Sequence, residues 1–289
     1  MKQISKILIA YDGSACSRAA LSDLRRAGLP ASLEAVVATI AFVFLPQEGE
    51  APDDDIVSPE AAQMVSPTQE HAVLAVQEAL AVAKEAADRV QANFPTWSVR
   101  TEADGDSPAW AIIKFAEALG VDLVVVGSNS HLSAGGRLIL GSVSQRVLHD
   151  APCSVRVARC SDEQREGPVR IVAGFNGSPD AEAAVEAIAA RTWPERSEVR
   201  VIAAGAAAKP TMAVEKLRAS GLITSEVQTD GEPAHSLIKE AENWGADSIF
   251  VGTRDMHGFP HLLHGSVSSA VAASAHCSVE VIRVRRAAA

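Results

Sequence analysis

Two stretches of sequence, 164 residues apart, decide the fold: Ile7-Leu8-Ile9-Ala10-Tyr11-Asp12-Gly13-Ser14 and Ile171-Val172-Ala173-Gly174-Phe175-Asn176-Gly177-Ser178. Each is an apolar run that ends in an aromatic residue, an Asp or Asn, and then Gly-Ser. Short apolar runs bounded by turn residues are typical of buried β-strands, and a Ser after such a turn is a favourable helix N-cap. Both stretches therefore predict a strand that leads directly into a helix.

Further pairs of segments recur downstream in the same order, which indicates an internal repeat. They are residues 121–128 with 246–253, residues 140–144 with 264–268, and residues 152–155 with 276–279. The spacing of the pairs falls along the chain, so the second copy is shorter than the first by 39 residues. We predict two domains, residues 1–161 and residues 168–289, joined by a short charged linker.

Strand and helix patterns alternate between these segments. Residues 46–67 are rich in proline and acidic residues and predict a solvated surface loop. Residues 69–94 predict a long helix, and residues 211–219 predict a short crossover helix in the second copy. The apolar spacing of the long helix runs through Val73, Leu80, Lys84, Ala87 and Val90. The pattern predicts an α/β fold of two tandem doubly wound, Rossmann-like domains, each with a mostly parallel five-stranded sheet.

The composition of the 289-residue chain disfavours several classes of protein. Hydrophobic residues make up 47% and charged residues 21%, which argues against long disorder. The net charge of −10 disfavours broad binding to nucleic acid or to an anionic membrane. Because no apolar run is long enough to span a bilayer and no signal peptide is evident, we expect a cytoplasmic protein with reduced cysteines.

The ends of two predicted strands carry the residues suited to a ligand. In an open parallel sheet, ligands bind beyond the carboxyl ends of the strands where the strand order reverses. The first strand leads to Asp12, and the fourth leads through Gly127 to a loop that ends in Gly141-Ser142 at the start of a helix. The N–H groups of a helix N-terminus favour an anion, and a carboxylate suits an adenine amino group or ribose hydroxyls. These residues predict a nucleotide site with no catalytic base or nucleophile.

The recurring features together resemble the universal stress protein family over nearly the whole chain. ATP-binding members of that family carry a Gly, two residues, a second Gly, nine residues, and then Gly-Ser or Gly-Thr. The first copy matches this pattern at Gly127 and at Gly141-Ser142, with Ser130 in place of the second Gly and one extra residue in the loop.

The second copy keeps the loop length of the family but changes its charges. Gly252 and Gly265-Ser266 match the pattern, whereas Asp255 replaces the second Gly and Asn176 stands where the first copy has Asp12. A carboxylate in a phosphate loop repels the ligand in a pocket of low dielectric constant. The first copy is therefore expected to bind the nucleotide better.

The resemblance implies a stress-response or signalling protein that binds ATP without substantial catalysis. The contacts it implies in the first copy are Asp12, Val43, Gly127, Ser128, Gly141, Ser142 and Val143, and the weaker contacts in the second copy are Asn176, Gly252, Gly265 and Ser266. It also implies that the last strands, residues 154–158 and 278–282, are edge strands that pair into an internal pseudo-dimer. A protein partner and a homodimer remain open.

Structural roles compete with each of these interpretations. Asp12 could form an Asx turn into the helix, and the two Gly-Ser pairs could be plain N-caps. The protein would then be a tandem scaffold with degenerate nucleotide sites that acts through protein contacts. We predict neither an enzyme, because no phosphate-binding lysine lies in the glycine loops, nor a metal site. A zinc site at His257, His261 and His264 would need a helix, which nearby Gly and Pro residues disfavour.

The remaining candidate residues are three cysteines. Cys153 and Cys277 are expected to be small core residues at the start of the last strands. Cys16 lies in the first turn of a helix, where a thiol pKa can fall, but a structural role is favoured over a redox role.

Overall fold

The computed structural model describes residues 3–41, 59–128, 131–132, 138–159, 166–204, 210–253 and 267–284. The first copy contains β1 (Lys6–Ala10), α1 (Ala15–Asp23), the 3₁₀ helix η1 (Leu24–Arg26), β2 (Glu34–Ala41), α2 (Pro59–Asn93), β3 (Ser98–Gly105), α3 (Pro108–Ala118), β4 (Leu123–Ser128), β5 (His131–Leu132), β6 (Leu138–Ile139), α4 (Ser142–Asp150) and β7 (Ser154–Arg159). The second copy contains β8 (Arg170–Phe175), α5 (Pro179–Ala189), β9 (Glu198–Ala204), α6 (Thr211–Ala219), β10 (Ile223–Thr229), α7 (Pro233–Trp244), β11 (Ser248–Gly252), α8 (Val267–Ser274) and β12 (Ser278–Ile282).

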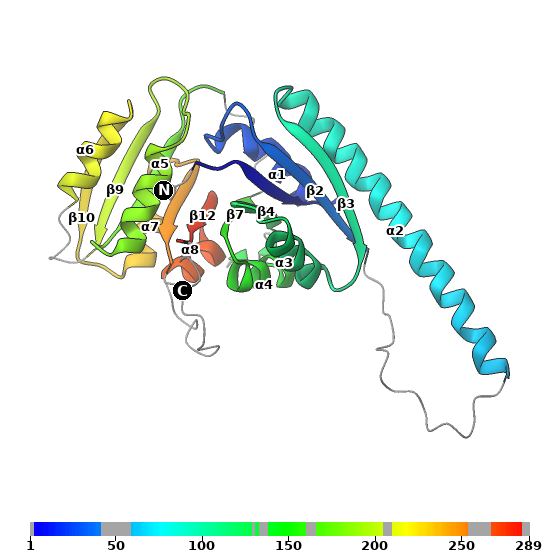
Figure 1. The fold of residues 1–289 in the computed structure, drawn as a ribbon. Coiled ribbons are helices and arrows are strands. Elements are labelled where there is room, and N and C mark those ends of the chain that lie inside the picture. The colour runs from blue at the N-terminus through cyan, green and yellow to red at the C-terminus, as the bar shows by residue number, and fades with distance from the viewer. Residues whose placement is uncertain are drawn as a thin grey trace, which may run out of the picture.

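Ten of the described strands form one continuous sheet in the order β10-β9-β8-β11-β12-β7-β4-β1-β2-β3 (Figure 1). Within each copy every neighbouring pair is parallel, and both copies place their strands in the same doubly wound order. The copies meet where β12 and β7 pair antiparallel. The predicted fold class and the predicted pairing of the last strands are confirmed, and the two five-stranded sheets are fused into one.

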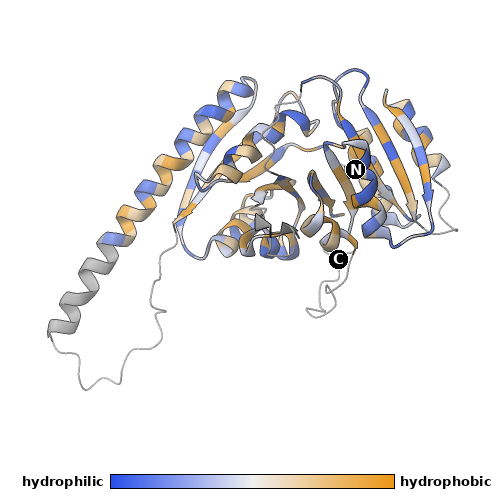
Figure 2. Ribbon diagram, turned by 180° about the vertical axis from the view of Figure 1, so that it is seen from behind, coloured by the Kyte–Doolittle hydropathy of each residue, from blue (hydrophilic) through white to orange (hydrophobic). Residues whose placement is uncertain are grey.

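Helices cover both faces of the sheet, and the apolar cores on the two faces differ. On one face a single cluster runs across both copies and includes Leu8, Ile112, Val157, Leu237 and Val281. On the other face the clusters are separate. One packs α1 and α2 on the first copy, and the other packs α5 and α6 on the second. Figure 2 shows hydrophobic and hydrophilic residues alternating along β9 and β10, as expected for strands that are half-covered.

The turn from strand to helix follows the sequence prediction in both copies. Ser14 accepts a hydrogen bond from the N–H of Ser17 and caps α1, and Ser178 caps α5 in the same way. The glycines before them, Gly13 and Gly177, have φ of +76° and +77°, which a residue with a side chain rarely adopts. Within the described residues, no helix is long and apolar enough to cross a membrane.

Helix α2 differs from its prediction in two respects. It begins at Pro59, so the predicted excursion is wrong for residues 59–67, and a proline suits the first position of a helix. The face turned to the sheet is made of alanines and one valine, Ala79, Ala83, Ala86 and Val90, whereas Val73, Leu80 and Lys84 are exposed. Small alanines let the helix lie close to the sheet, and its N-terminal half projects beyond it (Figure 1).

Candidate functional site

A cavity of about 220 Å³ opens at the carboxyl ends of β1 and β4, where the strand order of the first copy reverses. Five segments supply its walls: the β1–α1 turn, β2, the end of β4, the start of α3 and the start of α4. The predicted site residues that line it are Asp12, Gly127, Gly141, Ser142 and Val143. The structure therefore brings together five of the seven residues predicted for the first copy.

Asp12 is held in the β1–α1 turn by two short-range hydrogen bonds. Its Oδ1 accepts the N–H of Ser14 at 3.0 Å, and its own N–H donates to Oγ of Ser17 at 3.4 Å. Partial burial tends to raise the pKa of Asp12, but hydrogen bonds from Ser14 and Ser17 outweigh that effect and hold the pKa below its ordinary 3.8. The carboxylate is thus anionic at neutral pH and can accept hydrogen bonds from a ligand.

The corresponding turn of the second copy has the same geometry without the charge. Oδ1 of Asn176 accepts the N–H of Ser178 at 3.0 Å, as Asp12 does with Ser14. Both side chains form an Asx turn, so the predicted structural role of Asp12 in this turn is confirmed. Because a neutral amide makes this turn equally well, the turn does not require the negative charge of Asp12.

Gly127 and Gly252 have a structural role that the sequence did not reveal. A Cβ built on Gly127 would lie 2.6 Å from the backbone oxygen of Cys16, and one built on Gly252 would lie 2.0 Å from that of Asp180. In both copies the glycine lets the first turn of a helix, α1 or α5, cross the end of the fourth strand at close range. These glycines are required by packing in both copies, whether or not a ligand binds.

Gly141, in contrast, has no structural need to be glycine. It is the N-cap of α4 with φ −62° and ψ 152°, a conformation open to any residue, and a Cβ there would meet no atom of the described residues within 4 Å. The N-cap role predicted for the Gly141-Ser142 pair is therefore filled by Gly141, whereas Ser142 is the first helical residue and does not cap the helix. Oγ of Ser144 donates to the carbonyl of Gly127 at 2.7 Å and fixes this helix start against β4.

Several predicted residues lie elsewhere. Ser128 does not line the cavity: it is fully buried, and its hydroxyl accepts a hydrogen bond from the guanidinium of Arg159. Side chains alternate along a strand, so Gly127 and Ser128 belong to opposite faces of the sheet. Residues outside the described part of the chain are Val43, Ser130, Asp255, Gly265, Ser266 and the histidines His257, His261 and His264. Within the described part, no group of acidic, histidine or cysteine residues could hold a metal ion.

Sequence reasoning missed part of the cavity wall. The missed lining residues are Ile40 in β2, Pro108 and Ile112 at the start of α3, and Cys16 in the first turn of α1. The signal for Ile112 was the apolar face of its helix, but only the crossing of α3 over β1 and β2 brings that face to the cavity. Cys153 is buried, as predicted, and Cys277 is partly buried, which raises the pKa of its thiol to about 12.

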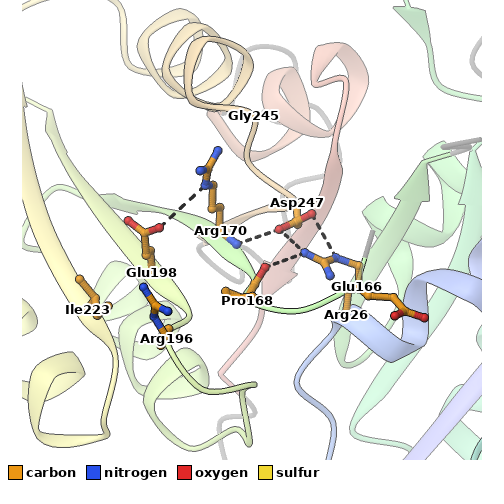
Figure 3. A pocket seen from close by; sticks show the side chains of 9 residues that line it. All are labelled: Arg26, Glu166, Pro168, Arg170, Arg196, Glu198, Ile223, Gly245 and Asp247. Carbon is orange, nitrogen blue, oxygen red and sulfur yellow. Dashed lines mark hydrogen bonds and ion pairs between the residues drawn. The ribbon is translucent and has the colours of Figure 1, made fainter. Parts of the chain in front are cut away.

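A larger cavity of about 540 Å³ lies at the amino ends of β8, β9 and β11 (Figure 3). Four of its charged residues form ion pairs. Arg26 of the first copy bonds Asp247 at 2.7 Å, and Arg170 lies 3.9 Å from Glu198. Asp247 also accepts the N–H of Arg170 at 2.8 Å. The Arg26–Asp247 pair joins the two copies, whereas Arg170 and Glu198 both belong to the second copy. Since doubly wound sheets bind ligands at the opposite end, the candidate site is the smaller cavity.

The fold and the cavity define a tandem doubly wound α/β protein with a ligand site at the carboxyl end of its first sheet. The model of the universal stress protein family matches residues 3–159 and 180–283. The chain belongs to the universal stress protein family, and the resemblance seen in the sequence is confirmed.

Known relatives share the tandem organisation over most of their length. A universal stress protein of Mycolicibacterium smegmatis is 28% identical over 307 residues, which cover 96% of this chain and 97% of that protein. Universal stress protein Rv2005c of Mycobacterium tuberculosis is 29% identical over 233 residues, which cover 72% and 75%. The crystal structure of a universal stress protein from Archaeoglobus fulgidus has a TM-score of 0.67 at 20% identity and covers 99% of this chain, so it shares the fold.

Proposed function

We propose that the first copy binds an adenine nucleotide, with ATP as the expected ligand, and that the bound state alters contact with a protein partner in a cytoplasmic stress response. The observation that carries the proposal is that Asp12 and the start of α4 line the same cavity. A carboxylate whose charge the fold does not need lies across from a helix N-terminus with no side-chain cap. One end suits the hydroxyls or amino group of a nucleoside, and the other suits a phosphate.

The lining residues also suggest how a nucleotide would lie. Asp12 would accept hydrogen bonds from the ribose or the base, and the backbone N–H groups of Ser142 and Val143 would face the phosphates. Ile40 and Ile112 offer apolar contact to the base. Among the described lining residues Asp12 is the charged one, and Cys16 contributes a thiol without a neighbouring histidine. This set offers no general base for phosphate chemistry, so we propose a binding protein without substantial catalysis.

The two copies are proposed to be unequal, with domain boundaries at residues 1–161 and 168–289. In the second copy Asn176 supplies a neutral amide where Asp12 supplies a carboxylate. Titration with ATP should therefore show one tight site per chain. Mass spectrometry of nucleotide retained through purification gives an independent measurement of the same site.

Substitution of Gly141 by Val tests the position of the phosphate site. A Cβ there has no atom of the described residues within 4 Å. The thermal unfolding midpoint should therefore fall only by the cost of a poorer N-cap, about 1 kcal/mol, while ATP affinity should fall several-fold because the side chain enters the phosphate approach. Unchanged affinity would show that the phosphates lie elsewhere.

A tandem scaffold with degenerate sites is the second candidate, and one observation favours it. The Asx turns and the glycines at the ends of β4 and β11 have packing roles in both copies, so these parts of the motif persist without a ligand. A wild-type chain that retains no nucleotide and shows no heat of binding with ATP would support the scaffold.

A further inference from the structure

The two strands that join the copies are nearly identical in sequence. Residues 154–157 read Ser-Val-Arg-Val and residues 278–281 read Ser-Val-Glu-Val. The one difference within these four positions is Arg156 against Glu280. Two copies that pair through such similar strands resemble the two halves of an isologous dimer, in which each residue meets its own counterpart across a two-fold axis.

The pairing register places this one difference on the pseudo-two-fold axis. Glu280 lies directly opposite Arg156, and Val279 and Val281 lie opposite Val157 and Val155. Nη1 of Arg156 lies 3.3 Å from Oε2 of Glu280, and both side chains are fully buried. In a pair of two first copies with this register, Arg156 would face another Arg156, and in a pair of two second copies Glu280 would face another Glu280.

Two further charges extend the pair into an alternating row. Within the first copy, Asp23 bonds both Nε and Nη2 of Arg156, at 2.5 and 3.0 Å. Within the second copy, Nη1 of Arg191 donates to Oε2 of Glu280 at 2.9 Å. The row of bonded charges therefore runs Asp23, Arg156, Glu280, Arg191 and alternates in sign, with both arginines sharing one carboxylate oxygen of Glu280.

This row occupies the face of the sheet where the two apolar cores are separate. Val155, Val157, Val279 and Val281 belong to the continuous core on the opposite face, which would accept any copy that presents the same valines. The apolar side of the junction therefore does not distinguish one copy from the other. The charged side does distinguish them, because like charges in contact in a low-dielectric interior are strongly unfavourable.

We propose that Arg156 and Glu280 select pairing between the first copy and the second copy, and reject pairing of either copy with itself. A self-paired first copy would carry the row Asp, Arg, Arg, Asp, and a self-paired second copy would carry Arg, Glu, Glu, Arg. Each row puts two buried like charges in contact at its centre. The identity of one residue per strand thus determines the partner of an otherwise shared edge.

A charge-reversal cycle in the full-length chain tests this selection. Four chains all carry Asp23→Asn and Arg191→Gln, which removes the outer charges, and they differ only at 156 and 280. One keeps Arg156 and Glu280, two carry the single reversals Arg156→Glu or Glu280→Arg, and the fourth carries both reversals. The readouts are the thermal unfolding midpoint and the mass in sedimentation.

Both opposite-charge chains should be monomers with midpoints within about 5 °C of each other. Both like-charge chains should unfold at least about 10 °C lower or associate into larger species. A double reversal that is no more stable than the single reversals would overturn the proposal, because the sign of the charges would then not matter.

Should none of these four chains fold, neutral and reversed variants that lose only one outer charge decide the question. In a chain that carries Asp23→Asn alone, Arg156→Gln removes the ion pair, whereas Arg156→Glu also places a like charge beside Glu280. In a chain that carries Arg191→Gln alone, Glu280→Gln and Glu280→Arg form the matched comparison from the other side. Each reversed variant should unfold at a lower temperature than its neutral partner, and equal midpoints in both comparisons would refute charge selection.

Discussion

The β1–α1 turn of the first copy and the β8–α5 turn of the second share their backbone and differ in charge. Both have a left-handed glycine, a capping serine and a side-chain oxygen that accepts a hydrogen bond from that serine's N–H. One side chain is Asp12 and the other is Asn176. The comparison separates what the fold needs, an oxygen acceptor, from what only a ligand would need, a negative charge.

A second difference between the copies concerns how close each helix passes to its sheet. The Cβ positions of Gly127 and Gly252 would meet helix backbone at 2.6 and 2.0 Å. Backbone cannot move aside as the end of a flexible side chain can. These residues therefore define the structural part of the motif, against which the ligand-dependent part can be measured.

The largest effect is expected from Gly252→Ala, which should destabilise the protein by about 3 kcal/mol. Gly127→Ala should cost about 2 kcal/mol, because its contact is less severe. Gly141→Ala is the matched control and should cost less, about 1 kcal/mol for the poorer N-cap, since its Cβ meets no atom of the described residues. Urea unfolding measures all three. Similar costs at the three positions would remove the distinction between packing glycines and ligand glycines.

Asp12→Asn converts the first turn into the second and should lower ATP affinity about tenfold, or about 1.4 kcal/mol. The expected cause is loss of a charged acceptor, because the amide can still accept the Ser14 N–H as Asn176 accepts that of Ser178. Calorimetric titration gives the affinity, and an unchanged unfolding midpoint confirms that the turn survives.

Asn176→Ala is the control on the other copy and should change ATP affinity less than twofold, if the tight site lies in the first copy. Equal losses from Asp12→Asn and Asn176→Ala would mean that the two copies bind alike. The charge comparison would then have no functional consequence.

The smallest effect is expected for Asp12→Asn, on the stability of the protein at acidic pH. The pKa of Asp12 is lowered in the folded protein, so its carboxylate contributes stability above its ordinary pKa of 3.8, and the contribution is lost as the pH falls through the lower folded pKa. Asp12→Asn should therefore reduce slightly the loss of stability as the pH falls below 3.8. Urea midpoints across this range measure the difference. A steeper acid loss in the variant would contradict the lowered pKa.

Much of the fold was predictable because it follows from local pattern. Apolar runs, glycines with positive φ and serine caps predicted the strands and the helix starts, down to α6 at Thr211–Ala219. The long helix was less predictable. The predicted spacing is right at Ala87 and Val90, which are buried, and wrong at Val73, Leu80 and Lys84, which are exposed, because most of the buried face is made of alanines. Spacing shows that a helix is amphipathic, but the depth of the groove it fills decides which residues touch the sheet.

The sequence by itself determined the tandem repeat, because similar segments recur in the same order in both halves. It also determined the doubly wound fold class and the candidate residues Asp12 and Gly141, because the strand and helix patterns and the turn residues are local. Only the tertiary structure showed that Ser128 faces away, that Gly127 serves helix packing, and that Arg156 meets Glu280. Those contacts join segments far apart in sequence. Strand register and the distance between helix and sheet fix them, and neither is encoded in local periodicity.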